Sequence, residues 1–442
     1  MSWSVTRRRF LQSVAGAAGI APIGGRFGGP IVLGQERKVR HASVGAAGQA
    51  LADIRAFSSH PAFTLAAVAD VDQSRTAQVK KLFPEARIYQ DWREMFRKEQ
   101  DHIDSVNVST PDHMHAPIAM AAMSMGKAVY VQKPLALTIR ETRILALKAR
   151  QASLVTQMGI QISSHETQLV TEQLIRDGAV GKIREVHTFC DKAWGDTNPI
   201  PPGADPVPEG LDWDGWIGVS EPRPYKATVY HPGNWRKRMG YGTGTLGDMG
   251  CHIFSTPLRG LGLTLPRQVT SYGPAPVHDN WPVQSKIKFV FGGTPYTANE
   301  TVDFWWYDGA ERPPQTVIDA AGGKLPSSGS VMIGTEGAIL LPHIDYPSLH
   351  PQAKFIDREI EKGTSRNHYH EFLDAVLKGP GTKCSANMDY AALVTEAVLL
   401  GTIALQRPSE PLEYDCDAMQ FERGRDRGNG FSRRYREQYL QP

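Results

Sequence analysis

A lysine in the N-terminal third of the chain stands where ligands commonly bind. Lys133 follows the apolar run Ala128 to Val131 and precedes Pro134, so we expect it at the end of a buried strand. Burial disfavours the charged form of an ammonium, so such a lysine needs a polar partner or gives up its proton more readily. Ligands bind at the carboxyl ends of strands in doubly wound sheets, which makes Lys133 a candidate catalytic residue.

A second candidate pair lies further along the chain. The glycine-rich stretch Gly240 to Gly247 leads into a predicted helix, on which Asp248 and His252 fall one turn apart on one face. We expect Asp248 in the first turn, where the helix dipole favours its anion. The same dipole would keep His252 neutral, as suits a proton acceptor, although Asp248 acts in the opposite direction. The alternative is a surface Asp–His pair without chemistry.

The elements ahead of Lys133 predict a nucleotide domain. Lys38 to Val44 is a predicted strand, followed by a turn that departs from Gly-x-Gly-x-x-Gly. Gly45 keeps the first glycine, Ala47 and Ala50 replace the second and third, and Gly48 is additional. In that pattern the glycines allow a tight turn and close approach of a pyrophosphate. Taken alone, the segment is equally compatible with an ordinary strand–turn–helix.

The next predicted strand strengthens the nucleotide hypothesis. Thr64 to Ala69 ends in Asp70, about 20 residues past the turn, where an acidic residue binds the ribose hydroxyls of NAD. A carboxylate there repels a 2′-phosphate, so NAD is favoured. Arg75 is able to pair with that phosphate, which keeps NADP open. The alternative for Asp70 is a simple turn acid.

Two more strand–helix units follow. Ile103 to Val108 is a short apolar run, Ala116 to Met125 is a predicted helix capped by Gly126, and the strand before Lys133 comes next. Repeated alternation of strands and helices predicts a parallel sheet with helices on both faces, that is, an α/β Rossmann domain.

The segments around Lys133 carry a family resemblance. Ser-Thr-Pro-Asp-His-x-His at 109–115, the glycine-capped helix and Gln-Lys-Pro-Leu at 132–135 resemble the glucose–fructose oxidoreductase / inositol dehydrogenase / MocA-like family. The family more often has Glu-Lys-Pro, and Gln132 replaces that carboxylate. The resemblance implies a nicotinamide dinucleotide, with Lys133 near its reactive ring. It also implies that Asp248 and His252 complete a catalytic site with the lysine.

The resemblance and the motifs together define the candidate cofactor site and the domains. The candidate cofactor-binding residues are Gly45, Ala47, Gly48, Asp70, Arg75, Ser109, Pro111, His113, His115, Gln132 and Lys133. We expect an export signal at 1–34, the Rossmann domain at 35–158 and a second domain at 159–442. By resemblance that second domain is α+β, with a large open, mainly antiparallel sheet that commonly forms a subunit interface. The Pro- and Gly-rich stretch 198–224 is expected to overhang the active site.

Other motifs are weaker. Tyr230, His231, Asn234 and Trp235 either line a sugar pocket or pack within a loop. The histidines at 113, 115, 368 and 370 lack the His-Glu-x-x-His spacing, so no metal is expected.

Composition excludes several classes of protein. The net charge of +3 and the lack of a long basic run give no reason to expect nucleic acid. The four cysteines form no CxxC pair, and no run of roughly 18 apolar residues predicts a membrane span. Thr6 to Gln12, with Arg7 to Arg9 ahead of an Ala/Gly-rich stretch, resembles a twin-arginine signal and predicts export to the periplasm. The alternative is an ordinary charged N-terminus.

These features lead to one main hypothesis and two rivals. The main one is NAD(P)-dependent hydride transfer from a sugar-like secondary alcohol or polyol, with His252 as base, Lys133 as donor to the reacting oxygen, and Asp248 orienting either His252 or a neighbouring hydroxyl. The first rival is a glycosidase or lyase that oxidises its sugar transiently. The second is a nucleotide-binding scaffold without catalysis.

Overall fold

The structure is a computed structural model that describes residues 37–421 and 430–439. Its N-terminal part is a six-stranded sheet in the order β3-β2-β1-β4-β5-β6, parallel throughout. The strands are β1 (Val39–Val44), β2 (Phe63–Ala69), β3 (Arg87–Tyr89), β4 (Ser105–Val108), β5 (Ala128–Gln132) and β6 (Thr156–Gly159). This is the predicted Rossmann topology, and the order reverses at β1 and β4, where such sheets bind ligands.

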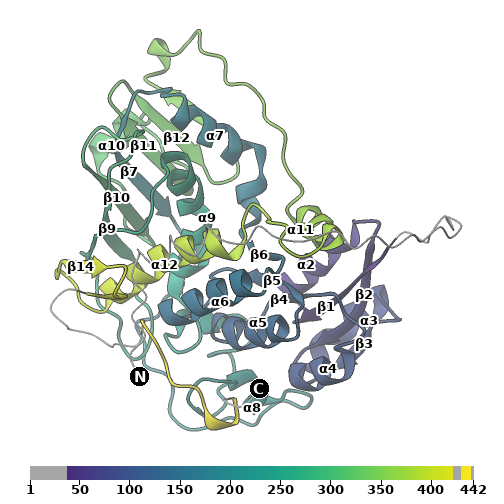
Figure 1. Cartoon of the computed structure of the whole chain (residues 1–442). Helices are drawn as coiled ribbons and strands as arrows, with labels where there is room; N and C mark the ends of the chain where they lie inside the picture. The colour runs from purple at the N-terminus through teal and green to yellow at the C-terminus, as the bar shows by residue number, and fades with distance from the viewer. Residues whose placement is uncertain (1–36, 422–429, 440–442) are drawn as a thin grey trace, which may run out of the picture.

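Helices cover both faces of this sheet (Figure 1). They are α2 (Gln49–Ser58), α3 (Ala77–Leu82), α4 (Trp92–Glu99), α5 (His115–Ser124) and α6 (Ile139–Gln151), with α11 (His368–Lys378) added from the C-terminal part. In β5, Val129 and Val131 belong to the largest core cluster, whereas Tyr130 packs with Phe57 and Phe372. Both sides of the strand are therefore buried, which explains its continuous apolar sequence.

The C-terminal part is a nine-stranded sheet in the order β13-β12-β11-β7-β10-β9-β8-β14-β15. The strands are β7 (Ile183–Cys190), β8 (Gln268–Ser271), β9 (Ser285–Gly292), β10 (Thr301–Asp308), β11 (Ser328–Gly334), β12 (Ala338–Pro342), β13 (Ser348–His350), β14 (Leu412–Asp415) and β15 (Gln420–Phe421). Only β7 and β10 pair in parallel; the other neighbours are antiparallel. The predicted α+β class with a large, mainly antiparallel sheet is confirmed.

Two long helices pack on the large sheet, and one of them also contacts the small sheet. α9 (Gly244–Leu261) packs on α7 (Glu166–Arg176), on α12 (Met388–Leu405) and on strands of the large sheet. α12 also contacts α6 and β6, and Figure 1 shows it lying across the middle of the molecule. Among the described residues, α12 alone is long and apolar enough to cross a membrane, and 78% of that stretch is buried inside the protein.

The Pro- and Gly-rich stretch after β7 contains one short helix, α8 (Trp213–Ile217). It docks on the residues that follow β2. Asp212 N donates to Val71 O at 2.8 Å and Gln73 N donates to Gly210 O at 2.9 Å. The stretch therefore covers the edge of the nucleotide domain beside Asp70. The remaining helix, α10 (Gln315–Ala320), packs against β11. The expected export signal lies outside the described residues.

Candidate active site

The turn after β1 is built for close approach of a ligand. Gly45 has φ 110°, and a Cβ there would lie 2.7 Å from the carbonyl oxygen of Ser109. Gly48, with φ 59°, directly precedes α2. Ala47 lies between them, half-buried. The turn thus leads into a helix N-terminus, where main-chain N–H groups and the helix dipole attract a phosphate.

Asp70 is held at the end of β2. Its Oδ2 accepts from Ala46 N at 2.8 Å and its Oδ1 from Asp72 N at 3.0 Å. Burial raises the pKa of Asp70, while these hydrogen bonds and nearby Arg75 act against that rise. Arg75 also reaches the glycine turn, with Nη2 3.7 Å from a Cβ built on Gly48. A tight turn, a helix N-terminus and an acid at this position fit a nicotinamide dinucleotide.

Lys133 is tied to α9. Its Nζ donates to the main-chain oxygen of Asp248 at 2.6 Å and to Oδ1 of the same residue at 2.7 Å. The side chains are only 14% and 11% exposed, so this is a largely desolvated ion pair. An ammonium has three N–H donors, and these contacts use two of them. The third is available to a reacting oxygen.

Two further cations face the same carboxylate. Arg236 Nε donates to Asp248 Oδ1 at 3.2 Å, and Lys192 Nζ lies 3.7 Å from Oδ2. Burial alone would raise the pKa of Asp248, but the cations around it, Lys133 first, hold that pKa well below its usual range. Asp248 is therefore ionised throughout the pH range in which the protein would work.

His252 lies one turn further along α9. Burial lowers the pKa of His252 well below its usual value, and Lys133 and His343 lower it further, against the influence of Asp248. The His343 ring approaches at 5.8 Å between centroids. Within the described residues, Nδ1 of His252 is buried and has no hydrogen-bond partner. The ring is a neutral base with an unsatisfied nitrogen.

The expectation that the helix dipole acts on Asp248 is wrong. α9 begins at Gly244, so its first turn holds no acidic residue and Asp248 belongs to the second turn. Dipole effects fade beyond the terminal turn. Local cations and burial, rather than the dipole, set the charge of Asp248 and His252.

Gln132 does not face Lys133. Its Nε2 donates to both carboxylate oxygens of Asp53, at 3.0 and 2.9 Å. Asp53 is fully buried in α2 and also accepts from Ser109 Oγ at 2.6 Å. Burial raises the pKa of Asp53, and its hydrogen bonds lower it. A carboxylate is thus present beside position 132 after all, supplied by α2 and missed by sequence reasoning.

The histidines of the 109–115 motif bind main-chain oxygens. His115 places Nδ1 2.7 Å from Pro134 O and Nε2 2.9 Å from Thr110 O. His113 Nε2 lies 2.9 Å from Trp216 O, and Pro111 precedes the short turn that carries His113, whereas His115 is the first residue of α5. Among the described residues no group of three His, Cys, Asp or Glu side chains is arranged to hold a metal.

The four candidate sugar-binding residues make their contacts in different places. Tyr230 is buried in an aromatic cluster with Trp216 and Tyr241. His231 Nε2 pairs with Asp72 Oδ2 at 2.8 Å, on the nucleotide domain.

Asn234 donates to the main-chain oxygen of Thr228. Of these four residues, Trp235 lies nearest Asp248, because its ring centroid is 4.4 Å from the guanidinium of Arg236.

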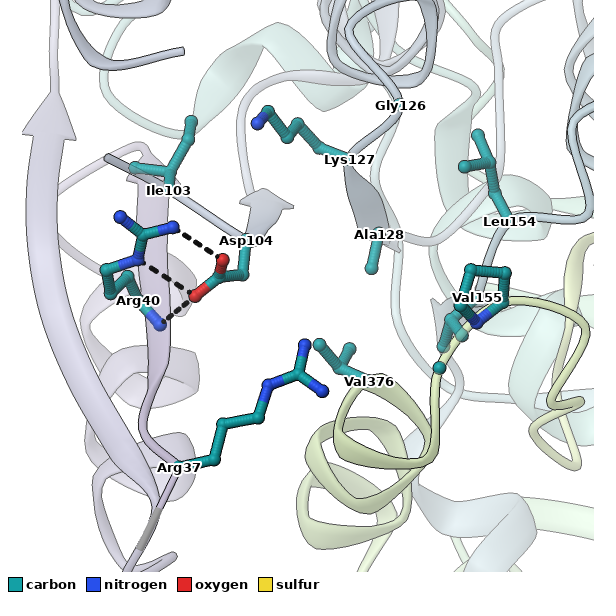
Figure 2. Close-up of a pocket in the computed structure, with 12 residues that line it drawn as sticks. Arg37, Arg40, Ile103, Asp104, Gly126, Lys127, Ala128, Leu154, Val155 and Val376 are labelled. Carbon is teal, nitrogen blue, oxygen red and sulfur yellow. Dashed lines mark hydrogen bonds and ion pairs between the residues drawn. The ribbon is translucent and has the colours of Figure 1, made fainter. Parts of the chain in front are cut away.

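A pocket of about 230 Å³ lies at the amino ends of the strands of the small sheet, opposite the ends that carry Asp70 and Lys133 (Figure 2). It is lined by Arg37, Arg40, Ile103, Asp104, Gly126, Lys127, Ala128, Leu154, Val155, Val376, Gly379 and Pro380. Figure 2 shows that Arg40 is paired with Asp104, at 2.8 Å between Nη2 and Oδ1. Most of these residues stand at the amino ends of β1, β4, β5 and β6, away from Lys133, and Val376, Gly379 and Pro380 come from the end of α11 and the residues after it. We therefore place the active site at the carboxyl ends of the strands, where Lys133 lies, and not at this pocket.

Sequence reasoning missed several residues of the site. They are Asp53 beside Gln132, Lys192 and Arg236 beside Asp248, His343 beside His252, Asp112, which accepts from Thr243 Oγ1 at 2.7 Å, and Trp194, whose ring centroid lies 5.4 Å from the Arg236 guanidinium. Arg236 ends the stretch 230–236, from which only four residues were chosen as candidates, and Asp112 stands inside the 109–115 motif, so both had a signal in the sequence. Lys192 and His343 come from strand ends of the large sheet and have no local pattern.

A Rossmann domain with Lys133, Asp248 and His252 at the junction with an open sheet defines a class of nucleotide-dependent oxidoreductases. Residues 39–160 match the family described as "Oxidoreductase family, NAD-binding Rossmann fold", and residues 182–286 match "Oxidoreductase family, C-terminal alpha/beta domain". The chain belongs to the glucose–fructose oxidoreductase / inositol dehydrogenase / MocA family.

Individual proteins are also similar to the chain. The chain is 26% identical to scyllo-inositol 2-dehydrogenase (NADP(+)) of Bacillus subtilis over 46% of each chain. It is 26% identical to an alpha-N-acetylgalactosaminidase of Shewanella oneidensis over 40% of each chain. A structure of GenD2 from gentamicin A biosynthesis, in complex with NAD, aligns with 90% of this chain and 100% of its own, with a TM-score of 0.58 and 17% identity. The chain spans less than half the length of the curated relatives it matches.

Proposed function

We propose that the protein is an NAD(P)-dependent dehydrogenase that oxidises a secondary alcohol of a sugar or polyol. The observation that carries the proposal is the Lys133–Asp248 ion pair beside His252, at the carboxyl end of a Rossmann strand. The polyol dehydrogenase among the relatives supports the same chemistry.

Proton transfer falls to His252. The ring is neutral because burial and neighbouring cations disfavour its protonation, so it accepts the hydroxyl proton of the substrate. Lys133 is fixed by two contacts to Asp248 and directs its remaining N–H toward the same oxygen. It stabilises the negative charge that develops there. Asp248 holds the ammonium in place and balances its charge.

The turn after β1, together with Asp70 and Arg75, would hold the dinucleotide at the carboxyl ends of the strands of the small sheet. Bound nicotinamide supplies the acceptor for the hydride that leaves the carbinol carbon. The stretch around α8 docks on the residues after β2 and so covers the sheet beside Asp70.

Replacing Lys133 tests the proposal. Lys133→Ala removes the donor to the reacting oxygen, so we expect turnover to fall at least a hundredfold while NAD binding, followed by fluorescence, is retained. Lys127→Ala is the matched control, since Lys127 stands at the opposite end of β5. Unimpaired turnover in Lys133→Ala would exclude the proposed role.

A second candidate function is glycoside cleavage through transient oxidation, which the glycosidase among the relatives favours. There the hydride taken from the sugar returns to it after the substituent is eliminated, so no reduced cofactor accumulates. Nitrophenyl glycosides separate the two functions: cleavage releases nitrophenol without net NADH, whereas oxidation produces NADH and a ketosugar.

Twin-arginine export to the periplasm remains our proposal for the localisation, on the strength of residues 6–12. Cell fractionation checks it: replacing Arg7, Arg8 and Arg9 by lysine should retain the protein in the cytoplasm.

The outer face of the large sheet is the surface we propose for self-association. Tyr272, 51% exposed, stacks on Trp305 at 5.7 Å there. A mass measurement in solution tests it: Tyr272→Glu should shift an oligomer toward monomer, and a wild-type monomer would exclude it.

A further inference from the structure

The charges around Asp248 do not balance. Three cations, Lys133, Lys192 and Arg236, lie within 4 Å of one ionised carboxylate. The Lys133 and Arg236 side chains are mostly shielded from water and Lys192 is half-exposed, so the cluster carries positive charge that a bound anion would offset.

The other titratable groups nearby do not supply that counter-charge. Asp112 is fully buried and accepts from Thr243 Oγ1 at 2.7 Å, and burial raises its pKa. Counting Asp112 as ionised still leaves one positive charge in excess. His252 and His343 face the same region as neutral rings, since burial lowers both their pKa values, that of His343 to about 4.

Arg236 is held as a rigid donor. Its guanidinium lies 4.4 Å from the ring centroid of Trp235 and 5.4 Å from that of Trp194. Its Nε contacts Asp248, and its Nη1 lies 3.5 Å from the main-chain oxygen of Gly233. Among the described residues Nη2 makes no hydrogen bond. A guanidinium fixed between aromatic rings loses little entropy when it binds an anion.

Lys192 completes the arrangement from the opposite side of Asp248. Its side chain is 49% exposed, and its Nζ lies 3.2 Å from Met249 Sδ and 3.7 Å from Asp248 Oδ2. The distance to the carboxylate is longer than a hydrogen bond. Asp248 therefore attracts the Lys192 ammonium but leaves it with N–H donors for a ligand.

We propose that the substrate is an acidic sugar, whose carboxylate binds between Lys192 and Arg236 while its reacting hydroxyl meets Lys133 and His252. The inference rests on the proposed oxidation of a sugar alcohol and adds the substrate class. The carboxylate supplies the missing counter-charge, and Arg236 offers the planar donor geometry that carboxylates prefer.

Matched pairs of sugars test the substrate class. Hexuronates and their parent hexoses, such as glucuronate with glucose and galacturonate with galactose, differ only at the terminal carbon. Reduction of NAD is followed at low and at physiological salt. We expect kcat/KM for the preferred hexuronate to exceed that for its hexose at least tenfold, as one charged hydrogen bond provides, with a smaller margin at high salt.

Two variants locate the carboxylate. Lys192→Gln and Arg236→Gln should each raise KM for the hexuronate about tenfold or more and raise KM for its uncharged methyl ester much less, so that the preference for the acid over the ester falls. Lys324→Gln is the matched control, since Lys324 is exposed in the turn after α10. Binding of hexuronate to the NAD-loaded protein, measured by calorimetry, provides a readout besides turnover.

The outcomes separate this inference from the proposed function. Equal or better turnover of the neutral hexoses overturns the acidic substrate and leaves the dehydrogenase intact. Hexuronate binding that depends on Arg236, without turnover of any sugar, overturns the dehydrogenase and supports the anion site. If the protein neither binds nor turns over a hexuronate, the inference is overturned.

Discussion

At the scale of single residues, one carboxylate organises the chemistry. Asp248 fixes Lys133 through two oxygens and draws Arg236 and Lys192 toward the same point. Two of those cations, Lys133 and Lys192, in turn help to keep His252 neutral. The base therefore owes its protonation state, and the donor to the reacting oxygen its position, to the same cluster of charged groups.

The pH dependence of turnover follows from this cluster. A histidine with its usual pKa would be protonated below about pH 6.5 and fail as a base. Because the pKa of His252 is lowered, we expect kcat/KM for oxidation to stay level from pH 8 to pH 6 and to fall only at lower pH. Steady-state rates across that range check this. A loss of activity that begins at pH 7 would contradict it.

A carboxylate at position 132, which the family usually has, should not be tolerated here. Gln132→Glu would place a second buried acid about 3 Å from Asp53 and remove the donor between them. We expect the free energy of unfolding to fall by about 2–4 kcal/mol. The exchange Asp53→Asn with Gln132→Glu restores a donor–acceptor pair and should recover part of that loss. Chemical denaturation of Gln132→Glu, Asp53→Asn and the double variant measures the coupling, and a double variant no more stable than Gln132→Glu would refute it.

At the scale of elements, the start of α9 determines where Asp248 stands. A Cβ on Gly247 would lie 1.7 Å from Thr243 Oγ1, the hydroxyl that donates to Asp112. We expect Gly247→Ala to displace Thr243, shift the helix, lower stability by about 1–3 kcal/mol and reduce turnover at least tenfold. Gly240→Ala is the control, because nothing lies within 4 Å of a Cβ there. Similar effects in both variants would contradict the steric argument.

The sequence predicts elements better than contacts that join them. Apolar runs and helix caps are local, so β1, β2, β5 and α5 follow from the chain alone. The start of α9 does not, because its glycines were expected to form a loop and instead become helical against the large sheet. Gln132 illustrates the same limit: its partner Asp53 is separated from it by 79 residues, and tertiary packing alone brings them together.

At the scale of the whole molecule, α12 joins the two sheets and so couples the nucleotide half to the half that carries Asp248. Leu135 N, two residues after Lys133, donates to Thr395 Oγ1 of α12 at 3.1 Å, and α12 packs along α9. The Lys133 and Asp248 segments are thus fixed to one buried helix, which holds the ion pair at the junction between the sheets.

Folding of the whole chain should also respond to pH through buried histidines. His41 lies within the small sheet, with Nδ1 2.7 Å from Ser105 Oγ and Nε2 3.0 Å from Asn107 Oδ1. Burial lowers the pKa of His41 to about 4. Between pH 6.5 and 4 the unfolded chain binds a proton on this ring and the folded protein does not, so the wild-type protein loses stability as the pH falls through this window.

Replacing His41 isolates that contribution. We expect His41→Gln to be less stable than the wild-type protein at pH 7, since it gives up well-placed hydrogen bonds. The difference should shrink by up to about 3 kcal/mol as the pH falls to 4, because the variant no longer carries the proton-linked penalty. Urea denaturation at pH 7, 5.5 and 4 measures both proteins. A difference that stays constant over this range would show that the ring is protonated in the folded protein as readily as in the unfolded chain.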